Sequence, residues 1–194
     1  MMKRICVFCG SNLGAGEAYR TAATQLGAAL VRHDLGLVFG GGRVGLMGVL
    51  ADAVLAGGGD VDGVIPQALV ARELAHRRVS KMHVVDSMHE RKALMADLSD
   101  GFIALPGGYG TLEEFCEMVT WSQLGLHRKP CGLLNVAGFF DSLLALFDHA
   151  IAEQFIVEAH RHLLVIDHDA EGLLGRMRSY EPPRVEKWID RDET

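Results

Sequence analysis

Hydrophobic residues in this chain fall into short continuous runs, which alternate with longer stretches where apolar and polar positions are mixed. The short apolar runs predict strands buried on both faces, and the mixed stretches between them predict amphipathic helices. Strands are expected at residues 4–9, 35–39, 61–65, 81–85, 101–105, 131–134 and 163–166. Helices are expected at 17–33, 45–56, 67–71, 87–98, 112–124, 140–153 and 170–178.

Strands and helices that alternate in this order predict a doubly wound α/β fold, with a parallel sheet of about seven strands and helices on both faces. A length of 194 residues without a linker or a repeat indicates one domain over 1–194, with a charged surface tail at 180–194. In such sheets, ligands bind at the carboxyl ends of the strands.

Three of the predicted strands are followed by loops rich in glycine or small polar residues, at 9–12, 40–45 and 106–111. Because the carboxyl ends of parallel strands lie at one edge of the sheet, these loops are expected to converge. The sequence therefore predicts a ligand site at that edge.

The loop at 40–45 has the spacing Gly-x-Gly-x-x-Gly, which is typical of dinucleotide binding when it opens a helix. It follows the second strand, however, and the next strand ends in Ile-Pro-Gln at 65–67, without the acidic residue that would hold a ribose. Gly41, Gly42 and Gly45 therefore form either part of a mononucleotide site or only a tight turn.

The loop at 106–111 reads Pro-Gly-Gly-Tyr-Gly-Thr and leads into a predicted helix. A helix N-terminus presents unpaired N–H groups, and glycines let an anion such as phosphate approach them. The loop is not a Walker motif, because no Gly-Lys-Ser/Thr follows, and ATP hydrolysis loses its main support. Thr111 and Glu114 have the spacing of a capping box, and spacing alone favours that structural role over a catalytic one for Glu114.

The predicted helix at 87–98 begins with a second capping box, formed by Ser87 and Glu90. Arg91 interrupts an apolar stripe on this helix, so its side chain either extends along its stem to water or meets an anion in a cleft. Lys92 doubles the local positive charge.

Charge and apolar content exclude several classes of protein. A formal net charge of −6 without a long basic stretch argues against nucleic-acid binding. No charge-free stretch approaches the roughly 20 residues of a membrane span, and the apolar run after the first four residues is too short for a signal peptide. A cytoplasmic protein is expected.

Cysteine and histidine spacing does not predict a metal site. Cys6 and Cys9 form a C-x-x-C inside a predicted strand, where residues three apart point to opposite faces. Both are expected to be small buried hydrophobic residues. His160 and His162 are expected at the surface.

Two long motifs resemble those of a known family. Residues 106–114 read P-G-G-x-G-T-x-x-E, and 88–92 read Met-His-Glu-Arg-Lys. Together they are similar to the Lonely Guy family, the cytokinin riboside 5′-monophosphate phosphoribohydrolases, and the similarity extends over about 4–155. Relatives also carry the label "possible lysine decarboxylase", but no site for pyridoxal phosphate is recognisable here.

The resemblance implies a Rossmann-like fold, a homodimer, and hydrolysis of an N6-substituted adenosine 5′-monophosphate to free base and ribose 5-phosphate without a cofactor. It implies that Arg91 and Glu114 are catalytic. The substrate contacts that it implies are Ser11, Glu73, Met88, Lys92, Gly107, Gly108, Tyr109, Gly110, Thr111, Leu112, Glu113 and Thr120. Asn12 stands where many relatives have serine, which affects only fine substrate contacts.

Three functions remain open on the sequence. The first is the phosphoribohydrolase reaction on N6-modified nucleotides. The second is a nucleosidase for plain AMP that tolerates such modifications. The third is a nucleotide or cofactor carrier without chemistry, which would not need a paired Arg91 and Glu114.

Overall fold

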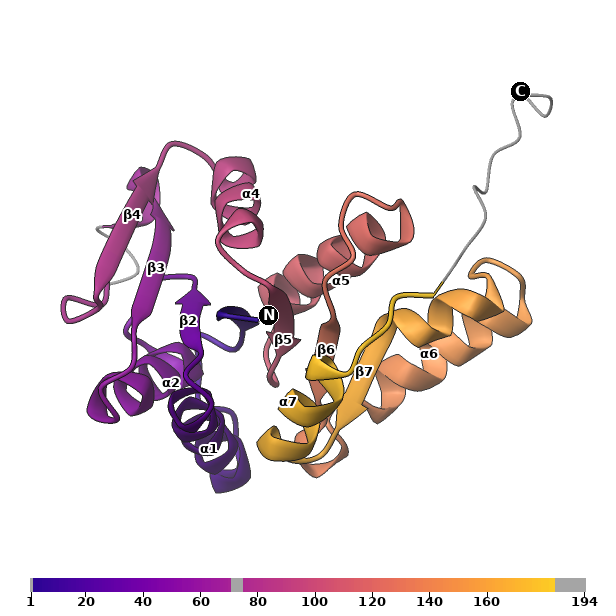
Figure 1. The fold of residues 1–194 in the computed structure, drawn as a ribbon, viewed down its shortest axis with the longest axis horizontal. Coiled ribbons are helices and arrows are strands. Elements are labelled where there is room, and N and C mark those ends of the chain that lie inside the picture. Colours follow the sequence, from indigo (N-terminus) through magenta and orange to yellow (C-terminus); the bar gives the residue numbers. More distant parts are fainter. Residues whose placement is uncertain (1, 71–74, 184–194) are drawn as a thin grey trace.

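The computed structural model describes residues 2–70 and 75–183 and contains one parallel sheet with helices on both faces (Figure 1). Its strands are β1 Arg4–Phe8, β2 Gly36–Phe39, β3 Val61–Pro66, β4 Lys81–Val85, β5 Gly101–Ala104, β6 Cys131–Leu134 and β7 Leu164–Asp167. Its α-helices are α1 Glu17–Arg32, α2 Gly45–Ala56, α3 Gln67–Val70, α4 Met88–Asp97, α5 Tyr109–Gln123, α6 Asp141–Ala152 and α7 Ala170–Arg178. Two 3-10 turns, η1 Val136–Gly138 and η2 Glu158–Leu163, complete the described elements. The predicted doubly wound α/β fold is confirmed, and most of the tail at 180–194 lies outside the described residues.

The strand order β4-β3-β2-β1-β5-β6-β7 places β1 at the point where the direction of winding reverses. In register, Val7 of β1 pairs with Phe39 of β2 and with Ile103 of β5. These three strands therefore end at the same level, and the loops that follow them meet at the topological switch point.

Separate apolar clusters cover the two faces of the sheet. One contains buried residues of α1, α2 and α7, and the other contains buried residues of α4 and α5. Cys9 belongs to the first cluster and Cys6 to the second, so their side chains lie on opposite faces, as expected. Burial raises the pKa of both thiols well above its usual value, which keeps them neutral. Among the described residues, no group of His, Cys, Asp and Glu could hold a metal ion.

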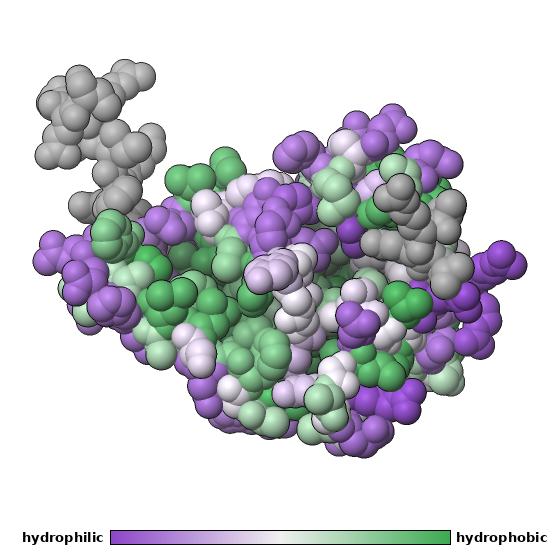
Figure 2. All heavy atoms as spheres, turned by 180° about the vertical axis from the view of Figure 1, so that it is seen from behind, coloured by the Kyte–Doolittle hydropathy of each residue, from purple (hydrophilic) through white to green (hydrophobic). Residues whose placement is uncertain are grey.

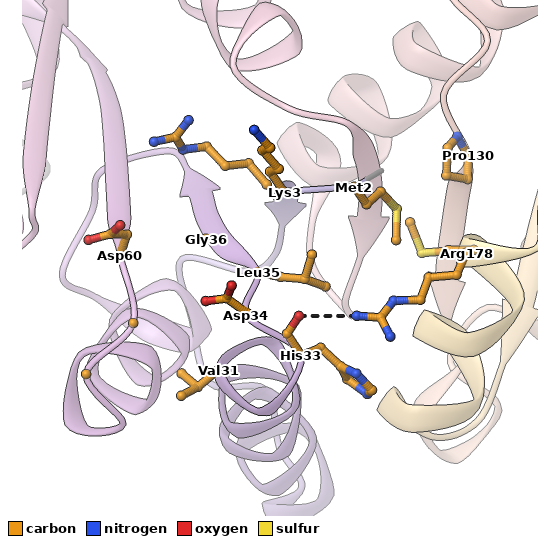
Figure 3. A pocket seen from close by; sticks show the side chains of 14 residues that line it. Met2, Lys3, Val31, His33, Asp34, Leu35, Gly36, Asp60, Pro130 and Arg178 are labelled. Carbon is orange, nitrogen blue, oxygen red and sulfur yellow. Dashed lines mark hydrogen bonds between the residues drawn. The ribbon is translucent and has the colours of Figure 1, made fainter.

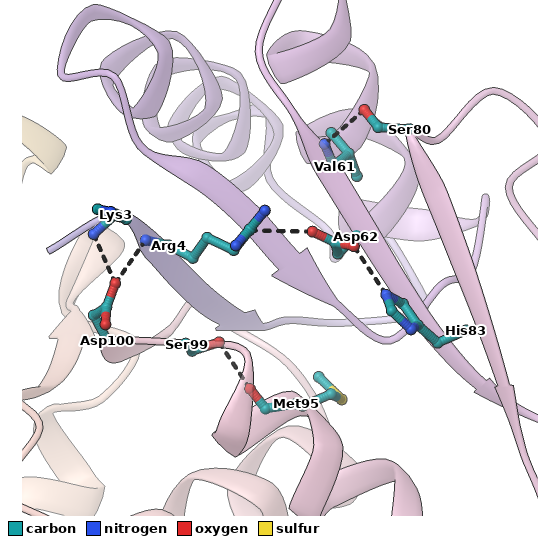
Figure 4. Close-up of polar contacts among 9 residues, drawn as sticks. All are labelled: Lys3, Arg4, Val61, Asp62, Ser80, His83, Met95, Ser99 and Asp100. Carbon is teal, nitrogen blue, oxygen red and sulfur yellow. Dashed lines mark hydrogen bonds and ion pairs between the residues drawn. The ribbon is translucent and has the colours of Figure 1, made fainter.

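A polar network lies near the amino-terminal edge of the sheet, away from the glycine loops (Figure 4). Asp62 is buried in β3, and its two carboxylate oxygens lie 3.2 Å from Arg4 Nε and 2.9 Å from His83 Nε2. The two contacts compensate for the burial of this carboxylate. Asp62 is therefore not placed to hold a ribose at the carboxyl edge.

One surface prediction is wrong. His160 lies in η2, which packs against α5 and α6, and its side chain is buried, whereas His162 is exposed as expected. Burial lowers the pKa of His160, and neither ring nitrogen finds a hydrogen-bond partner among the described residues. The prediction failed because it rested on the polarity of histidine alone. Whether a short turn is buried depends on distant segments that pack against it, here α5 and α6.

In the described part of the chain, no helix is both long enough and apolar enough to cross a membrane.

Candidate active site

The three loops at the switch point contact one another through their backbones. Gly10 N donates to Pro106 O at 3.1 Å, and Leu46 N donates to Gly10 O at 3.0 Å. Gly45 has a φ of +61°, and a Cβ there would lie 2.2 Å from the carbonyl carbon of Ser11. Convergence is therefore confirmed, and Gly45 is required for a tight turn.

Glycines of the third loop divide into two kinds. A Cβ on Gly107 would lie 2.1 Å from Thr111 Oγ1 and 2.9 Å from Gly10 N, so Gly107 allows the loops to pack. A Cβ on Gly108 or Gly110 would meet no atom within 4 Å. These two positions leave open space beside the N-terminus of α5, where an anion can approach the backbone N–H groups.

The predicted capping box at Thr111 is wrong. Helix α5 begins at Tyr109, three residues earlier than expected, and its N-cap is Gly108, which provides no side-chain cap. Thr111 therefore lies inside the first turn, where it is buried, and Glu114 lies one turn further on. Glu114 is the sixth residue of α5 and so lies outside the third helical position that a capping box requires.

The capping box of α4 is confirmed in part. Ser87 Oγ accepts a hydrogen bond from Glu90 N at 3.1 Å, as expected of an N-cap. Glu90 Oε2, however, accepts from Asp86 N at 2.9 Å. These two hydrogen bonds fix the first turn of α4 and so the orientation of Arg91 and Lys92, which follow it.

Arg91 does not extend to water, because it is only 7% exposed. Its Nη2 donates to Gly40 O at 3.3 Å, and the same nitrogen lies 3.7 Å from Glu114 Oε1. Nη1 contacts the sulfur of Met88 at 3.6 Å. Arg91 Nε is buried and has no hydrogen-bond partner among the described residues, so one donor of the guanidinium is unsatisfied there.

Glu114 is 9% exposed and joins Arg91 in an ion pair longer than a hydrogen bond. A buried pair of this kind adds little to stability compared with apolar packing, so its presence at a ligand edge indicates chemistry. The structure thus brings together the two residues that the resemblance implies are catalytic.

Gly40 is a site residue that sequence reasoning did not select. A Cβ at this position would lie 2.0 Å from Arg91 Nη2, so only glycine allows the guanidinium to reach the carbonyl of the same residue. Its place directly after the strand predicted at 35–39, at the start of one of the three converging loops, could have identified it.

Lys92 is held by acidic residues of α5. Its Nζ makes a short hydrogen bond to Glu113 Oε1 and lies 3.0 Å from Glu117 Oε2. Burial alone would lower the pKa of the ammonium, but these two carboxylates outweigh burial and raise the pKa above its usual value. These contacts join α4 to α5. The nucleotide contacts expected of Lys92 and Glu113 stay predictions.

The remaining expected contacts differ in position. Ser11, Met88 and Tyr109 are exposed at the carboxyl edge, and Tyr109 is 94% exposed. Thr120 lies nine residues beyond Thr111 on α5, about 13.5 Å along the helix axis, and its hydroxyl donates to Cys116 O at 2.8 Å. Thr120 is therefore not brought to the loop within this chain. Glu73 lies outside the described residues, and Leu112 is half-buried in the first turn of α5. Gly41 and Gly42 follow Gly40, whose carbonyl accepts a hydrogen bond from Arg91.

A cavity of about 1000 Å³ lies at the opposite edge of the sheet (Figure 3). It is lined by the starts of strands and by Arg178, which donates to His33 O at 3.2 Å. Neither Arg91 nor Glu114 lines this cavity, which is therefore separate from the pair.

The fold and the three converging loops define a Rossmann-like α/β protein with a candidate ligand site at the switch point of its sheet. Residues 47–177 match the model of a family described as possible lysine decarboxylase. The probable cytokinin riboside 5′-monophosphate phosphoribohydrolase LOGL9 of Oryza sativa subsp. japonica is 53% identical over 180 residues, which are 93% of this chain and 79% of that protein. LOG1 of Arabidopsis thaliana, which carries the same enzyme name, is 51% identical over 180 residues, or 93% of this chain and 84% of that protein. The chain belongs to the cytokinin riboside 5′-monophosphate phosphoribohydrolase family.

Solved structures share the fold at lower identity. The molybdenum cofactor carrier protein of Chlamydomonas reinhardtii has a TM-score of 0.71 at 20% identity, covering 93% of this chain and 98% of that chain. The molybdenum cofactor binding protein of Rippkaea orientalis has a TM-score of 0.70 at 22% identity, covering 92% of this chain and 97% of that chain. These similarities concern the fold alone.

Proposed function

We propose that this protein hydrolyses the N-glycosidic bond of N6-substituted adenosine 5′-monophosphates, releasing the free base and ribose 5-phosphate. The observation that carries the proposal is the buried pair of Arg91 and Glu114 beside the open glycines at the start of α5. The enzyme name shared by relatives about half identical over most of the chain supports it.

In this proposal the phosphate binds at Gly108 and Gly110, where the N–H groups and dipole of α5 favour an anion. Phosphate at that end of the helix places the ribose toward Glu114, one turn away. The requirement for a 5′-phosphate follows, because a riboside would lack the group that fixes its position.

Cleavage of the glycosidic bond passes through an oxocarbenium-like state, which a nearby carboxylate stabilises. Water adds to C1′ as the bond to the purine N9 breaks, and one proton of that water ends on the purine. Glu114 stabilises the cation or receives the proton first. Arg91 holds the nucleotide and Glu114 in position, or offsets negative charge on the leaving base.

The test is base release, measured by chromatography, from AMP, N6-isopentenyl-AMP, the corresponding riboside without phosphate, and GMP. We expect release from the N6-modified monophosphate and not from the riboside. A comparable kcat/KM for AMP would instead define an AMP nucleosidase. No release from any of the four, together with tight nucleotide binding, would support a carrier and contradict the proposal.

We also propose a homodimer, in which a second copy covers α6. No residue of α6 is buried, although the helix is largely apolar, and Leu146 is 58% exposed. Phe155, just beyond α6, is 79% exposed. In Figure 2, which is seen from behind, hydrophobic residues gather over the left half of the molecule, the half that carries α6 in Figure 1. Extended apolar surface of this kind is typical of subunit interfaces.

Replacing Leu146 by Asp is therefore expected to convert a dimer into a monomer, because a charge would be buried without a partner in the interface. Analytical ultracentrifugation at micromolar concentration measures the change. Leu13→Asp, at an exposed leucine in the loop before α1, is the matched control and should remain dimeric. A monomeric wild-type protein would contradict the proposal.

A cytoplasmic location is proposed as well. Cys6, Cys9, Cys116 and Cys131 are all free thiols. Disulfides form and persist in oxidising compartments, so four unpaired cysteines are in keeping with a reducing one.

A further inference from the structure

A second cleft, of about 720 Å³, lies beside the glycine loop that follows β2. Its described lining consists of four basic residues, one acidic residue and two apolar residues: Arg43, Asp52, Val70, Ala75, His76, Arg77 and Arg78. None of these residues belongs to the pair formed by Arg91 and Glu114. The cleft is therefore a separate feature of the carboxyl edge.

Positive charge exceeds negative charge in this cleft, although the whole chain has a net charge of −6. Asp52 Oδ1 accepts from Arg78 Nη2 at 2.5 Å and contacts His76 Nε2 at 3.1 Å. Arg43 and Arg77 are exposed, and neither makes a hydrogen bond or ion pair within the described residues. Within the described lining, three arginines against one aspartate thus leave two positive charges uncompensated.

The cleft is built on a fixed backbone. His76 is buried, and its backbone N donates to Gly41 O at 2.9 Å. An antiparallel bridge joins Gly42 to Ala75. The ring of His76 packs edge-on against that of Phe39, with 6.4 Å between the ring centroids. These contacts tie the segment that carries Arg77 and Arg78 to the loop that carries Arg43.

The ring of His76 also has a defined orientation. Its Nδ1 accepts from Arg78 N at 3.4 Å, so Nε2 carries the proton that is donated to Asp52. Asp52 is thereby held by the histidine and by Arg78 together. This arrangement leaves Arg43 and Arg77 to meet a ligand.

We propose that this cleft is a second anion site, which binds a phosphate group carrying two negative charges. The charge of such a group matches the two uncompensated guanidinium groups. Guanidinium also matches the geometry of phosphate oxygens, with which it forms paired, charge-assisted hydrogen bonds. The inference goes beyond the proposed hydrolase function and does not depend on it.

The phosphate could come from inorganic phosphate or from a phosphate monoester, and the experiment separates these sources. Isothermal titration calorimetry of the full chain is carried out once with inorganic phosphate and once with ribose 5-phosphate. Binding that depends on Arg43 and Arg77 for phosphate alone identifies an inorganic phosphate site in the cleft, and such binding for both ligands identifies a site that accepts esters. No saturable binding of either would overturn the proposal.

The decisive variant is Arg43→Gln with Arg77→Gln, which removes both uncompensated charges. It is expected to lose one bound phosphate per chain, or to bind about tenfold more weakly or worse at that site. Arg20→Gln with Lys81→Gln removes two exposed charges elsewhere and is the matched control, which should bind as wild type does. Equal binding by all three proteins, or equal loss in both variants, would refute the site.

Base release by the Arg43→Gln, Arg77→Gln variant is expected to stay within twofold of wild type when phosphate is absent. This readout shows that the fold and the Arg91–Glu114 pair are intact. It also separates the two proposals, because the calorimetric result does not require that the protein hydrolyse anything.

Discussion

Replacing Glu114 by Gln is expected to lower kcat for the N6-modified monophosphate by about 10²–10⁴. Glutamine keeps the size of the side chain and an acceptor oxygen beside Arg91, but it carries no negative charge and cannot accept a proton. The loss should therefore appear in kcat, with a much smaller change in KM. Steady-state base release measures both constants.

Glu17→Gln, at an exposed glutamate in the first turn of α1, is the matched control and should retain full activity. Because glutamine keeps an acceptor oxygen beside the buried Arg91, Glu114→Gln should also unfold at nearly the wild-type Tm. Turnover within a few-fold of wild type would show that Glu114 is not the catalytic carboxylate. A large fall in Tm would assign it a structural role instead.

Replacing Gly40 by Ala is expected to lower kcat/KM by about 10²-fold, because a small misplacement of a positioning group has effects of this size. The new Cβ would lie 2.0 Å from Arg91 Nη2, which is the far end of a flexible side chain. Arg91 must therefore move, while the backbone can stay in place. Activity should fall without a comparable loss of stability.

Gly175→Ala on α7 is the matched control, because a Cβ there meets no atom within 4 Å. It should leave kcat/KM unchanged and stabilise the helix slightly, since alanine is the better helix former. If Gly40→Ala kept wild-type activity and Tm, the contact between Gly40 and Arg91 would have no role in positioning the guanidinium. A folded Gly40→Ala variant that still binds nucleotide but has a lower kcat/KM would support the positioning role.

The position of β1 explains why the candidate site forms where it does. Neighbouring strands on its two sides belong to opposite halves of the sheet, so the loops after β1, β2 and β5 face a common crevice. Arg91 comes from α4 in one half and Glu114 from α5 in the other, and they meet above this crevice. The pair therefore depends on the sheet being wound in both directions.

Periodicity in the sequence was sufficient to predict the fold class and the strands. Apolar runs buried on both faces have few alternative structures, and each predicted strand agrees with the structure to within one residue at either end. The glycine loops could also be placed at one edge, because parallel strands share a direction. The opposite orientation of Cys6 and Cys9 followed from the two-residue period of a strand.

Side-chain partners, in contrast, were decided by the tertiary structure. The spacing of Thr111 and Glu114 fits a capping box, yet α5 begins at Tyr109 with Gly108 as its N-cap, and Glu114 pairs with Arg91. Lys92 pairs with acidic residues 21 and 25 positions later, and His160 is buried by helices packed around its turn. Local sequence determines periodicity and backbone freedom, whereas burial and charge pairing depend on segments that only the folded chain brings together.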